Sequence, residues 1–389
     1  MIDSEIERAE PVLHVLPQTG TAQQQEQIDV DRELRFEFTG SGKEYFRIWI
    51  VNLCLTFATL GIYSAWAKVR RLQYFARNTQ LDGAAFDFHG NPKAILKGRV
   101  LAVVLFAVYH YAFGFSKAFG VAVVGFLFLS LPWLLRGALR FRLHNTLYRG
   151  LRFAFTGTLP QAYLVYFPMM AAFFLPAALL ALYPGNPGRA ALSGLLYLVW
   201  PLWHARVKRY QQSHLQYGNL RAEYSVSNGE FFARYFFAGL VGMLGAILAG
   251  MLVGGASLLF KGQGGVTYIL GFAGSLLSIY VSYLFAAPHL QASIYNLTWS
   301  NTAFPNGWIE STLKPNAYVQ LQAGNAVLTI LTLGLYRPFA VVRAYRYRLE
   351  HTAVRINASL DKVTAAPRSG AAGASGDSAD DFLGFDLSW

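Results

Sequence analysis

Two apolar stretches of the chain each carry a stripe of hydrogen-bonding side chains. The same residue types recur with the same spacing, as Asn52, Thr56 and Thr59 and again as Asn325, Thr329 and Thr332. Residues three or four apart share one face of a helix, so each set forms one polar stripe. Such a stripe either hydrogen-bonds within the helical packing or lines a pore or gate for a polar solute. The sequence leaves both interpretations open.

Arginine and lysine follow the apolar stretches in clusters interleaved with aromatic residues. Arg70, Arg71, Arg140, Arg142, Lys208, Arg209, Arg343 and Arg346 are the candidates for contact with anionic lipid. Basic residues beside apolar runs set the orientation of a membrane protein and attract anionic headgroups or phosphorylated ligands. Because this placement explains the net charge of +12, we do not expect nucleic acid as a partner.

The sequence holds no arrangement that names a reaction. It has no nucleophile elbow, phosphate-binding loop or dinucleotide fingerprint, and no His or Cys spacing typical of a metal site. We therefore predict no enzyme, no catalytic residue, no metal and no cofactor. The long apolar runs also lack Asp and Glu, which argues against an ion-coupled transporter but leaves a channel or facilitator open.

The elements that position these side chains are membrane segments. Of the 389 residues 54% are hydrophobic and 14% are charged, and no acidic residue occurs between Asp87 and Glu223 or between Glu230 and Glu310. Apolar runs of about 18 residues or more indicate membrane helices. Helical hairpins are expected at 100–135, 162–203 and 235–287, and single apolar runs at 48–66 and 319–339. The acidic beginning of the chain predicts no cleavable signal peptide.

A shared frame recurs five times along the chain. An apolar run ends, a basic helix follows, and then comes a polar residue, at Asn78, Asn145, His214, Asn301 and His351. Threonine follows in four of the five copies, and short strand-like stretches come next. The units run over 36–80, 86–146, 153–215, 224–302 and 309–352. His214 and His351 occupy the asparagine position, so we interpret them as capping groups.

The repeat units differ in whether they contain an even or an odd number of apolar segments that could cross the membrane. Three copies contain a hairpin that returns to its starting side, whereas the first and last contain a single run. If all basic connections are cytoplasmic, these runs do not cross, and we expect re-entrant or interfacial segments broken at Gly61 and Gly334. The competing interpretation is eight spans.

The stretch FTGSGKEYFRIWIVNLCLTFATLGIYSAWAKVRRLQYFARNTQLDGAAFDFHG at 38–90 resembles the opening of the YjgN-like family of bacterial inner-membrane proteins. That family is defined as a domain of unknown function, and the resemblance extends over about residues 34–360. It implies a multi-pass inner-membrane protein. It implies no activity and carries over no functional residue.

These observations predict an all-α polytopic membrane protein with a fivefold repeat, about six full spans, two broken or re-entrant segments, and short cytoplasmic strands that could form one small sheet. The repeat domain covers 34–360, between a disordered tail at 1–33 and a flexible acidic-aromatic tail at 361–389 that could dock a protein partner. The expected location is the bacterial inner membrane, with the long basic connections in the cytoplasm. The function predicted first is a channel or permease for a small polar or anionic solute. The alternative is a non-catalytic scaffold that binds anionic lipid or proteins through its basic face. The oligomeric state stays open.

Overall fold

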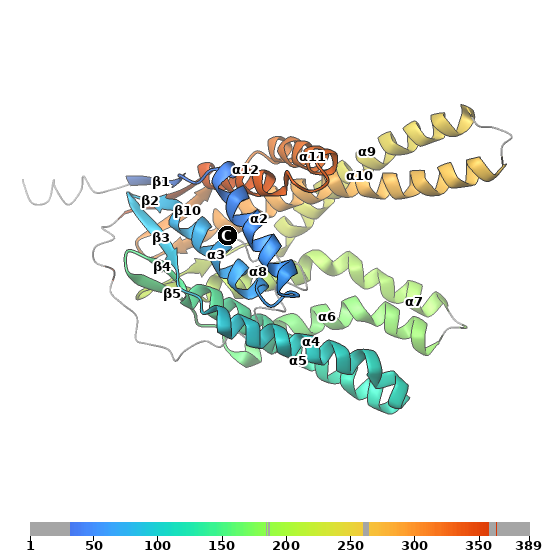
Figure 1. The fold of residues 1–389 in the computed structure, drawn as a ribbon, viewed down its shortest axis with the longest axis horizontal. Coiled ribbons are helices and arrows are strands. Elements are labelled where there is room, and N and C mark those ends of the chain that lie inside the picture. The colour runs from blue at the N-terminus through green and yellow to red at the C-terminus, as the bar shows by residue number, and fades with distance from the viewer. Residues whose placement is uncertain (1–31, 184, 186, 260–263, 358–362, 364–389) are drawn as a thin grey trace, which may run out of the picture.

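A barrel of short strands stands at one end of the molecule, and helical hairpins project from it (Figure 1). The computed structural model describes residues 32–183, 185, 187–259, 264–357 and 363. The predicted tails at 1–33 and 361–389 lie outside these residues, except that Arg32 and Glu33 belong to the first strand and Val363 is buried against the barrel.

The strands come in pairs that separate one hairpin of helices from the next. Their hydrogen-bonded order is β7-β6-β5-β4-β3-β2-β1-β11-β10-β9-β8, with every neighbouring pair antiparallel. The bounds are β1 Arg32–Phe38, β2 Thr79–Leu81, β3 Ala84–Phe88, β4 Thr146–Tyr148, β5 Leu151–Phe155, β6 Leu215–Tyr217, β7 Leu220–Arg221, β8 Glu223–Tyr224, β9 Thr302–Phe304, β10 Gly307–Ser311 and β11 Thr352–Ile356.

The two ends of this order are adjacent in the sequence, which nearly closes the barrel. Only Ala222 separates β7 from β8, and its N–H donates to Leu215 of β6 over 2.8 Å. One half of the stretch 220–224 therefore pairs with β6 and the other half with β9. Few edge groups are left unpaired, which matters because strands this short have little stability alone.

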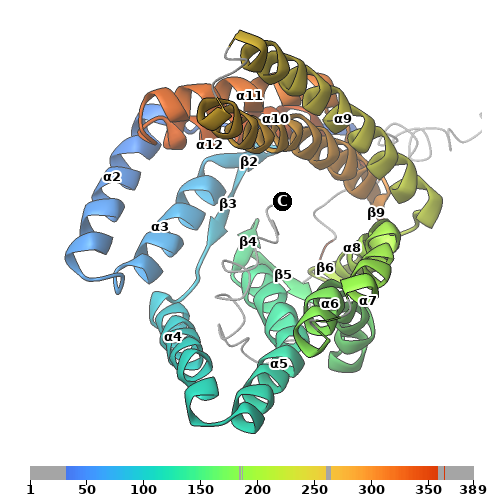
Figure 2. The same ribbon diagram turned by 90° about the vertical axis from the view of Figure 1, so that its right-hand side faces the viewer.

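Helical hairpins leave the barrel at one end and surround a common centre (Figure 2). The first hairpin along the chain is α2 Gly42–Ala58 with α3 Ser64–Arg77, and the second is α4 Pro92–Phe115 with α5 Lys117–His144. The third pairs α6 Leu159–Leu182 with a second arm made of α7 Pro187–Gly194, η1 Leu195–Val199 and α8 Trp200–Ser213. The fourth is α9 Asn228–Leu259 with α10 Gly264–Trp299, and the fifth is α11 Pro315–Leu331 with α12 Arg337–Glu350. The short pairs α2–α3 and α11–α12 lie side by side, where Phe46 stacks on Phe339 with ring centres 5.6 Å apart.

Five helices of the described residues are long and apolar enough to cross a membrane: α4, α5, α6, α9 and α10. They match five of the six predicted crossing segments. The sixth, at 190–203, is divided among α7, η1 and α8, none of which reaches that length alone. The predicted helical membrane architecture is confirmed in part, because helices make up most of the described structure, but the short strands assemble into one 11-stranded sheet, so the fold is not all-α. Their pairing joins residues far apart in sequence, which no local pattern specifies.

The same cap closes the second helix of each hairpin. The side chains of Asn78, Asn145, His214, Asn301 and His351 each meet the carbonyl oxygen four residues earlier, at 2.7 to 2.9 Å. The hydroxyls of Thr79, Thr146, Thr302 and Thr352 donate to the next carbonyl, also four residues back. These bonds satisfy carbonyls at a helix end where no further amide follows. The capping role predicted for His214 and His351 is confirmed.

A glycine two residues after a strand phenylalanine recurs where the chain leaves the barrel. A Cβ on Gly40 would lie 2.6 Å from the ring of Phe38, and one on Gly157 would lie 2.6 Å from the ring of Phe155. The phenylalanine ring thus packs directly on the glycine backbone, and a side chain there would overlap it.

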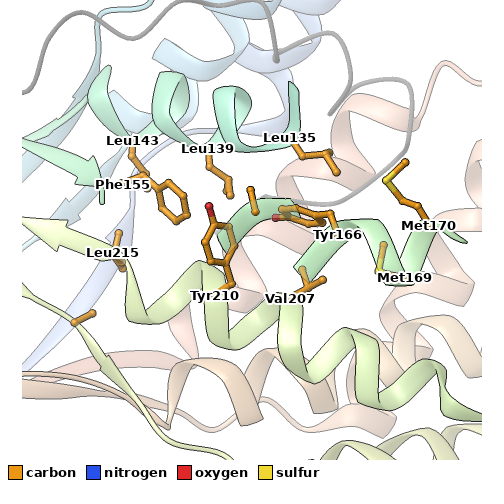
Figure 3. Packing of buried hydrophobic residues seen from close by; sticks show 12 residues of the cluster. Leu135, Leu139, Leu143, Phe155, Tyr166, Met169, Met170, Val207, Tyr210 and Leu215 are labelled. Atoms are coloured by element: carbon orange, nitrogen blue, oxygen red, sulfur yellow. The ribbon is translucent and has the colours of Figure 1, made fainter. Parts of the chain in front are cut away.

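The largest buried cluster joins helices to strands at the base of the second and third hairpins (Figure 3). Tyr210 of α8 points between Phe155 of β5 and Tyr166 of α6, with ring centres 5.2 and 5.9 Å away. Its hydroxyl donates to the carbonyl of Thr158 over 3.1 Å. The barrel and hairpins therefore share one core at this junction.

Replacing Gly157 with alanine should lower stability by about 1–3 kcal/mol, because the added methyl overpacks Phe155 and Tyr210. The melting temperature of the protein in lipid nanodiscs measures the loss. Gly125→Ala is the matched control, since nothing lies within 4 Å of a Cβ there. Equal melting temperatures for both variants would contradict this packing.

The cap at Asn301 should accept histidine but not alanine. Asn301→Ala loses the bond to the Leu297 carbonyl and should cost about 1 kcal/mol. Asn301→His should retain most of that stability, because His214 and His351 make the same bond elsewhere. Thermal unfolding of the two variants compares them directly, and equal destabilisation by both would refute an equivalent cap.

Candidate functional site

The inner face of the barrel encloses a cavity of about 460 Å³, here called the lumen cavity. Its lining is predominantly aromatic and aliphatic, and ligand pockets of about 300–1,000 Å³ with such linings are common. Strand residues supply one part, including Phe36, Phe86, Tyr148, Phe153 and Tyr217, and α3, α5, α10 and α12 supply the rest. The cavity therefore lies where the barrel meets the helical bundle.

Tyrosines order the strand side of this cavity. The Tyr148 hydroxyl donates to the carbonyl of Leu81 over 2.8 Å, and the Tyr217 hydroxyl donates to the carbonyl of Tyr148 over 3.1 Å. Burial raises the pKa of Tyr217 to about 12. Both phenols are therefore neutral donors in a poorly hydrated interior.

A second cavity of about 350 Å³ adjoins the first and is here called the bundle cavity. The two share Leu143, Tyr295, Trp299 and Arg348 in their linings. The bundle cavity is more polar, with Lys208, Gln211 and Gln212 of α8 among its lining residues. Gln212 is only 6% exposed, and its Oε1 has no hydrogen-bond partner among the described residues.

His204 also lines the bundle cavity. Its Nδ1 lies 2.8 Å from the hydroxyl of Tyr235. Burial, assisted by the positive charge of Lys208, lowers the pKa of His204 to about 3. The imidazole is therefore neutral at physiological pH and adds a polar contact but no charge.

Cationic side chains line both cavities. Arg71, Arg142 and Arg348 line the lumen cavity, and Arg348 and Lys208 line the bundle cavity. Among the residues that the structure describes, the lining of the two cavities includes no aspartate or glutamate. Burial raises the pKa of Tyr345 beside them, and the charges of Arg348 and Arg142 act against that increase. The two guanidinium groups therefore converge on the same tyrosine.

The carboxylates of the barrel lie elsewhere, on its strands and strand turns. Asp82 pairs with Arg32 at 2.8 Å and Arg149 at 2.6 Å, and Glu310 pairs with Arg355 at 2.6 Å. Ion pairs on the barrel strands thus neutralise part of its charge, whereas the two cavities have a cationic lining.

The cavity-lining side chains follow a fixed position in the repeat frame. The residue three places before each cap is Phe75, Arg142, Gln211, Thr298 or Arg348, and all five line one of the two cavities. One helical position in each hairpin therefore contributes to a common site. Arg348 was not among the predicted site residues, although its shared offset with Arg142 could have identified it.

The structure places the two predicted polar stripes at the tips and inner faces of the short hairpins. The hydroxyls of Thr56 and Thr59 donate to the carbonyls of Asn52 and Leu55 over 2.7 and 2.8 Å. Thr59 Oγ1 also accepts a hydrogen bond of 2.9 Å from the amide of Tyr63. These bonds cap α2 and start the turn to α3, where Leu60 and Gly61 have φ values of 49° and 91°.

The second stripe repeats this arrangement. Thr329 and Thr332 donate to the carbonyls of Asn325 and Leu328, and the amide of Tyr336 donates to Thr332 Oγ1 over 3.0 Å. Asn52 and Asn325 are buried, with 7% and 3% of their surface exposed. Asn325 donates to the carbonyl of Ala340, which ties α11 to α12. None of the six residues is among those lining the two cavities.

The eight predicted basic residues divide into three groups. Arg71, Arg142 and Lys208 line the cavities. Arg209 donates to the Val226 carbonyl, Arg346 to the Gly40 carbonyl and Arg343 to the Tyr336 hydroxyl, so these three also hold the fold. Arg70 is exposed beside the ring of Tyr63, and Arg140 is partly buried on α5.

No group of three or more His, Cys, Asp or Glu side chains in the described part of the chain is placed to hold a metal ion. Cys54 is an exposed free thiol on α2.

Comparison with known proteins gives a family but no activity. Residues 33–382 match the family described as "Bacterial protein of unknown function (DUF898)". The "Inner membrane protein YjgN" of Salmonella typhimurium is 23% identical over 348 residues, covering 82% of this chain and 87% of the relative. The protein of that name from Escherichia coli K12 is 31% identical over 147 residues, covering 36% of this chain and 34% of the relative. No solved structure matches. With five apolar helices of spanning length among its described residues, this chain is a membrane protein that belongs to the DUF898 family.

Proposed function

We propose that this protein is a membrane-embedded binding protein or permease for an anionic solute. The observation that supports this is the cationic lining of the two cavities, to which Arg71, Arg142, Lys208 and Arg348 contribute. Arginine can bind a phosphate or carboxylate through two hydrogen bonds, which suits it to this role.

The proposed topology puts the barrel in the cytoplasm and the long hairpins across the membrane. Each hairpin leaves and re-enters the barrel, so it crosses an even number of times or not at all. The pair α2–α3 is too short to cross and return, and α11–α12 is its counterpart. Their tip leucines, Leu60 and Leu333, are each 95% exposed, which fits insertion of the turns into lipid. This supports the re-entrant alternative over eight spans.

Binding inside the protein fits better than an open pore or an external scaffold. The threonines of the polar stripes use their hydroxyls to cap their own helices, as at Thr59 and Thr332. On the outer side, Arg209 and Arg346 are engaged with backbone carbonyls. The cavities are therefore the place where cationic groups and enclosed space coincide.

Glycerol 3-phosphate should bind to the protein in nanodiscs of zwitterionic lipid, and uncharged glycerol should not. Replacing Arg142 or Arg348 with glutamine should weaken binding about tenfold or more, because each loses a charge-assisted hydrogen bond of about 1.5–3 kcal/mol. Isothermal titration calorimetry measures the dissociation constants, and uptake of the labelled anion into proteoliposomes tests transport.

Arg70→Gln is the matched control, since Arg70 is exposed and lines neither cavity. Melting temperatures establish that each variant is folded. The proposal fails if the anion does not bind, or if all three variants bind it as the wild type does.

A cysteine at the tip of the first short hairpin should be unreactive from both sides of the membrane. In a Cys54→Ala background, Leu60→Cys should resist a membrane-impermeant thiol reagent, because lipid surrounds the turn. Glu37→Cys on β1 should react only from the cytoplasmic side, where the barrel is proposed to lie. Reaction of Leu60→Cys from the outside would instead indicate a full crossing and overturn the re-entrant topology.

A further inference from the structure

We propose that the ligand is a single-chain anionic amphiphile, with its hydrocarbon chain in the lumen cavity and its phosphate-type head at the boundary with the bundle cavity. This rests on the proposed anion-binding function and names the class of ligand. Two adjoining cavities with different linings support this assignment.

The lumen cavity is too apolar for a small inorganic anion alone. Rings of Phe36, Phe75, Phe86, Phe153 and Tyr217 form much of its wall. A hydrated phosphate placed among them would lose its water shell and gain few hydrogen bonds. A hydrocarbon chain would gain from the same surface, at about 25 cal/mol for each Å² of apolar area removed from water.

Charge gathers at the boundary that the two cavities share. Arg348 lines both, Arg142 and Arg71 line the lumen side, and Lys208 lines the bundle side. These donors come from four different helices, α3, α5, α8 and α12. A head group at this boundary can accept hydrogen bonds from several of them while its chain extends into the lumen.

The bundle cavity also offers an acceptor. Gln212 is 6% exposed, and its Oε1 has no partner among the described residues, although buried carbonyl oxygens normally accept a hydrogen bond. Beside it lie the Gln211 amide and neutral His204. A head group that carries a hydroxyl as well as a negative charge could donate to the Gln212 carbonyl oxygen and accept hydrogen bonds from the cationic side chains at the boundary. A glycerol phosphate ester has this chemistry.

Octyl phosphate should bind at least about 100-fold more tightly than glycerol 3-phosphate, because burial of only four methylene groups gives a factor of that size. Titration into protein-containing nanodiscs, corrected for partition into empty nanodiscs, measures both dissociation constants. Octanol, which has the chain without the charge, should bind far more weakly than octyl phosphate.

A variant that fills the lumen cavity tests the contribution of the hydrocarbon chain to binding separately from that of the head group. Ala76 lines the lumen cavity but not the bundle cavity. Ala76→Phe should therefore bring octyl phosphate close to the affinity of glycerol 3-phosphate and leave the latter unchanged. Ala58→Phe, at the exposed end of α2, is the size-matched control.

Photocrosslinking of the unaltered protein keeps the test independent of how the variants fold. Octyl phosphate with a diazirine at its chain end should label peptides from β3 to β5, at 84–88 and 146–155. Labelling confined to the long hairpins would overturn the inference.

The binding results distinguish the two proposals. Equal affinities for octyl phosphate and glycerol 3-phosphate would overturn the amphiphile and leave the anion site standing. Binding of octanol as tight as that of octyl phosphate, or no binding of any probe, would overturn both.

Discussion

Backbone hydrogen bonds between strands of different hairpins hold this molecule together. None of the strands exceeds seven residues, and several have two or three, so no hairpin could form a stable sheet alone. Pairing in one sheet supplies every strand except β7 and β8 with neighbours on both sides, and the stretch 220–224, which contains β7 and β8, nearly closes the ring. Because every hairpin starts and ends in the ring, all of them leave from the same end of the barrel. The cavities exist because of this closure.

The caps at the helix ends make this arrangement geometrically regular. The second helix of each hairpin ends at an asparagine or histidine, whose side chain bonds to the carbonyl oxygen four residues earlier. The strand then begins at the next residue. A fixed distance from cap to strand gives the residue three places earlier a fixed direction, toward the cavities. This is why Arg142 and Arg348 converge although more than two hundred residues separate them in the sequence.

Local sequence patterns predicted the helices, the caps and the short strands, but not the pairing of those strands into one nearly closed barrel. Apolar runs identified five long helices, and the His214 and His351 substitutions correctly indicated capping. The sequence did not predict the barrel, because a pairing such as that of Arg35 with Ala353 joins residues far apart in the chain. Strands this short also leave no periodic pattern that would specify their partners. The polar stripes were visible, but only the structure showed that Thr59 and Thr332 bond their own helices. For the same reason Lys208 and Arg346 looked equivalent in sequence, whereas one lines a cavity and the other binds a backbone carbonyl.

The central claim is that the cationic boundary between the lumen and bundle cavities holds an anion. Electron cryomicroscopy of the protein in nanodiscs at saturating octyl phosphate tests it most directly. We predict non-protein density that begins between Arg142 and Arg348 and extends into the barrel. A barrel that is nearly closed, as in this structure, but whose two cavities remain empty under those conditions would contradict the account.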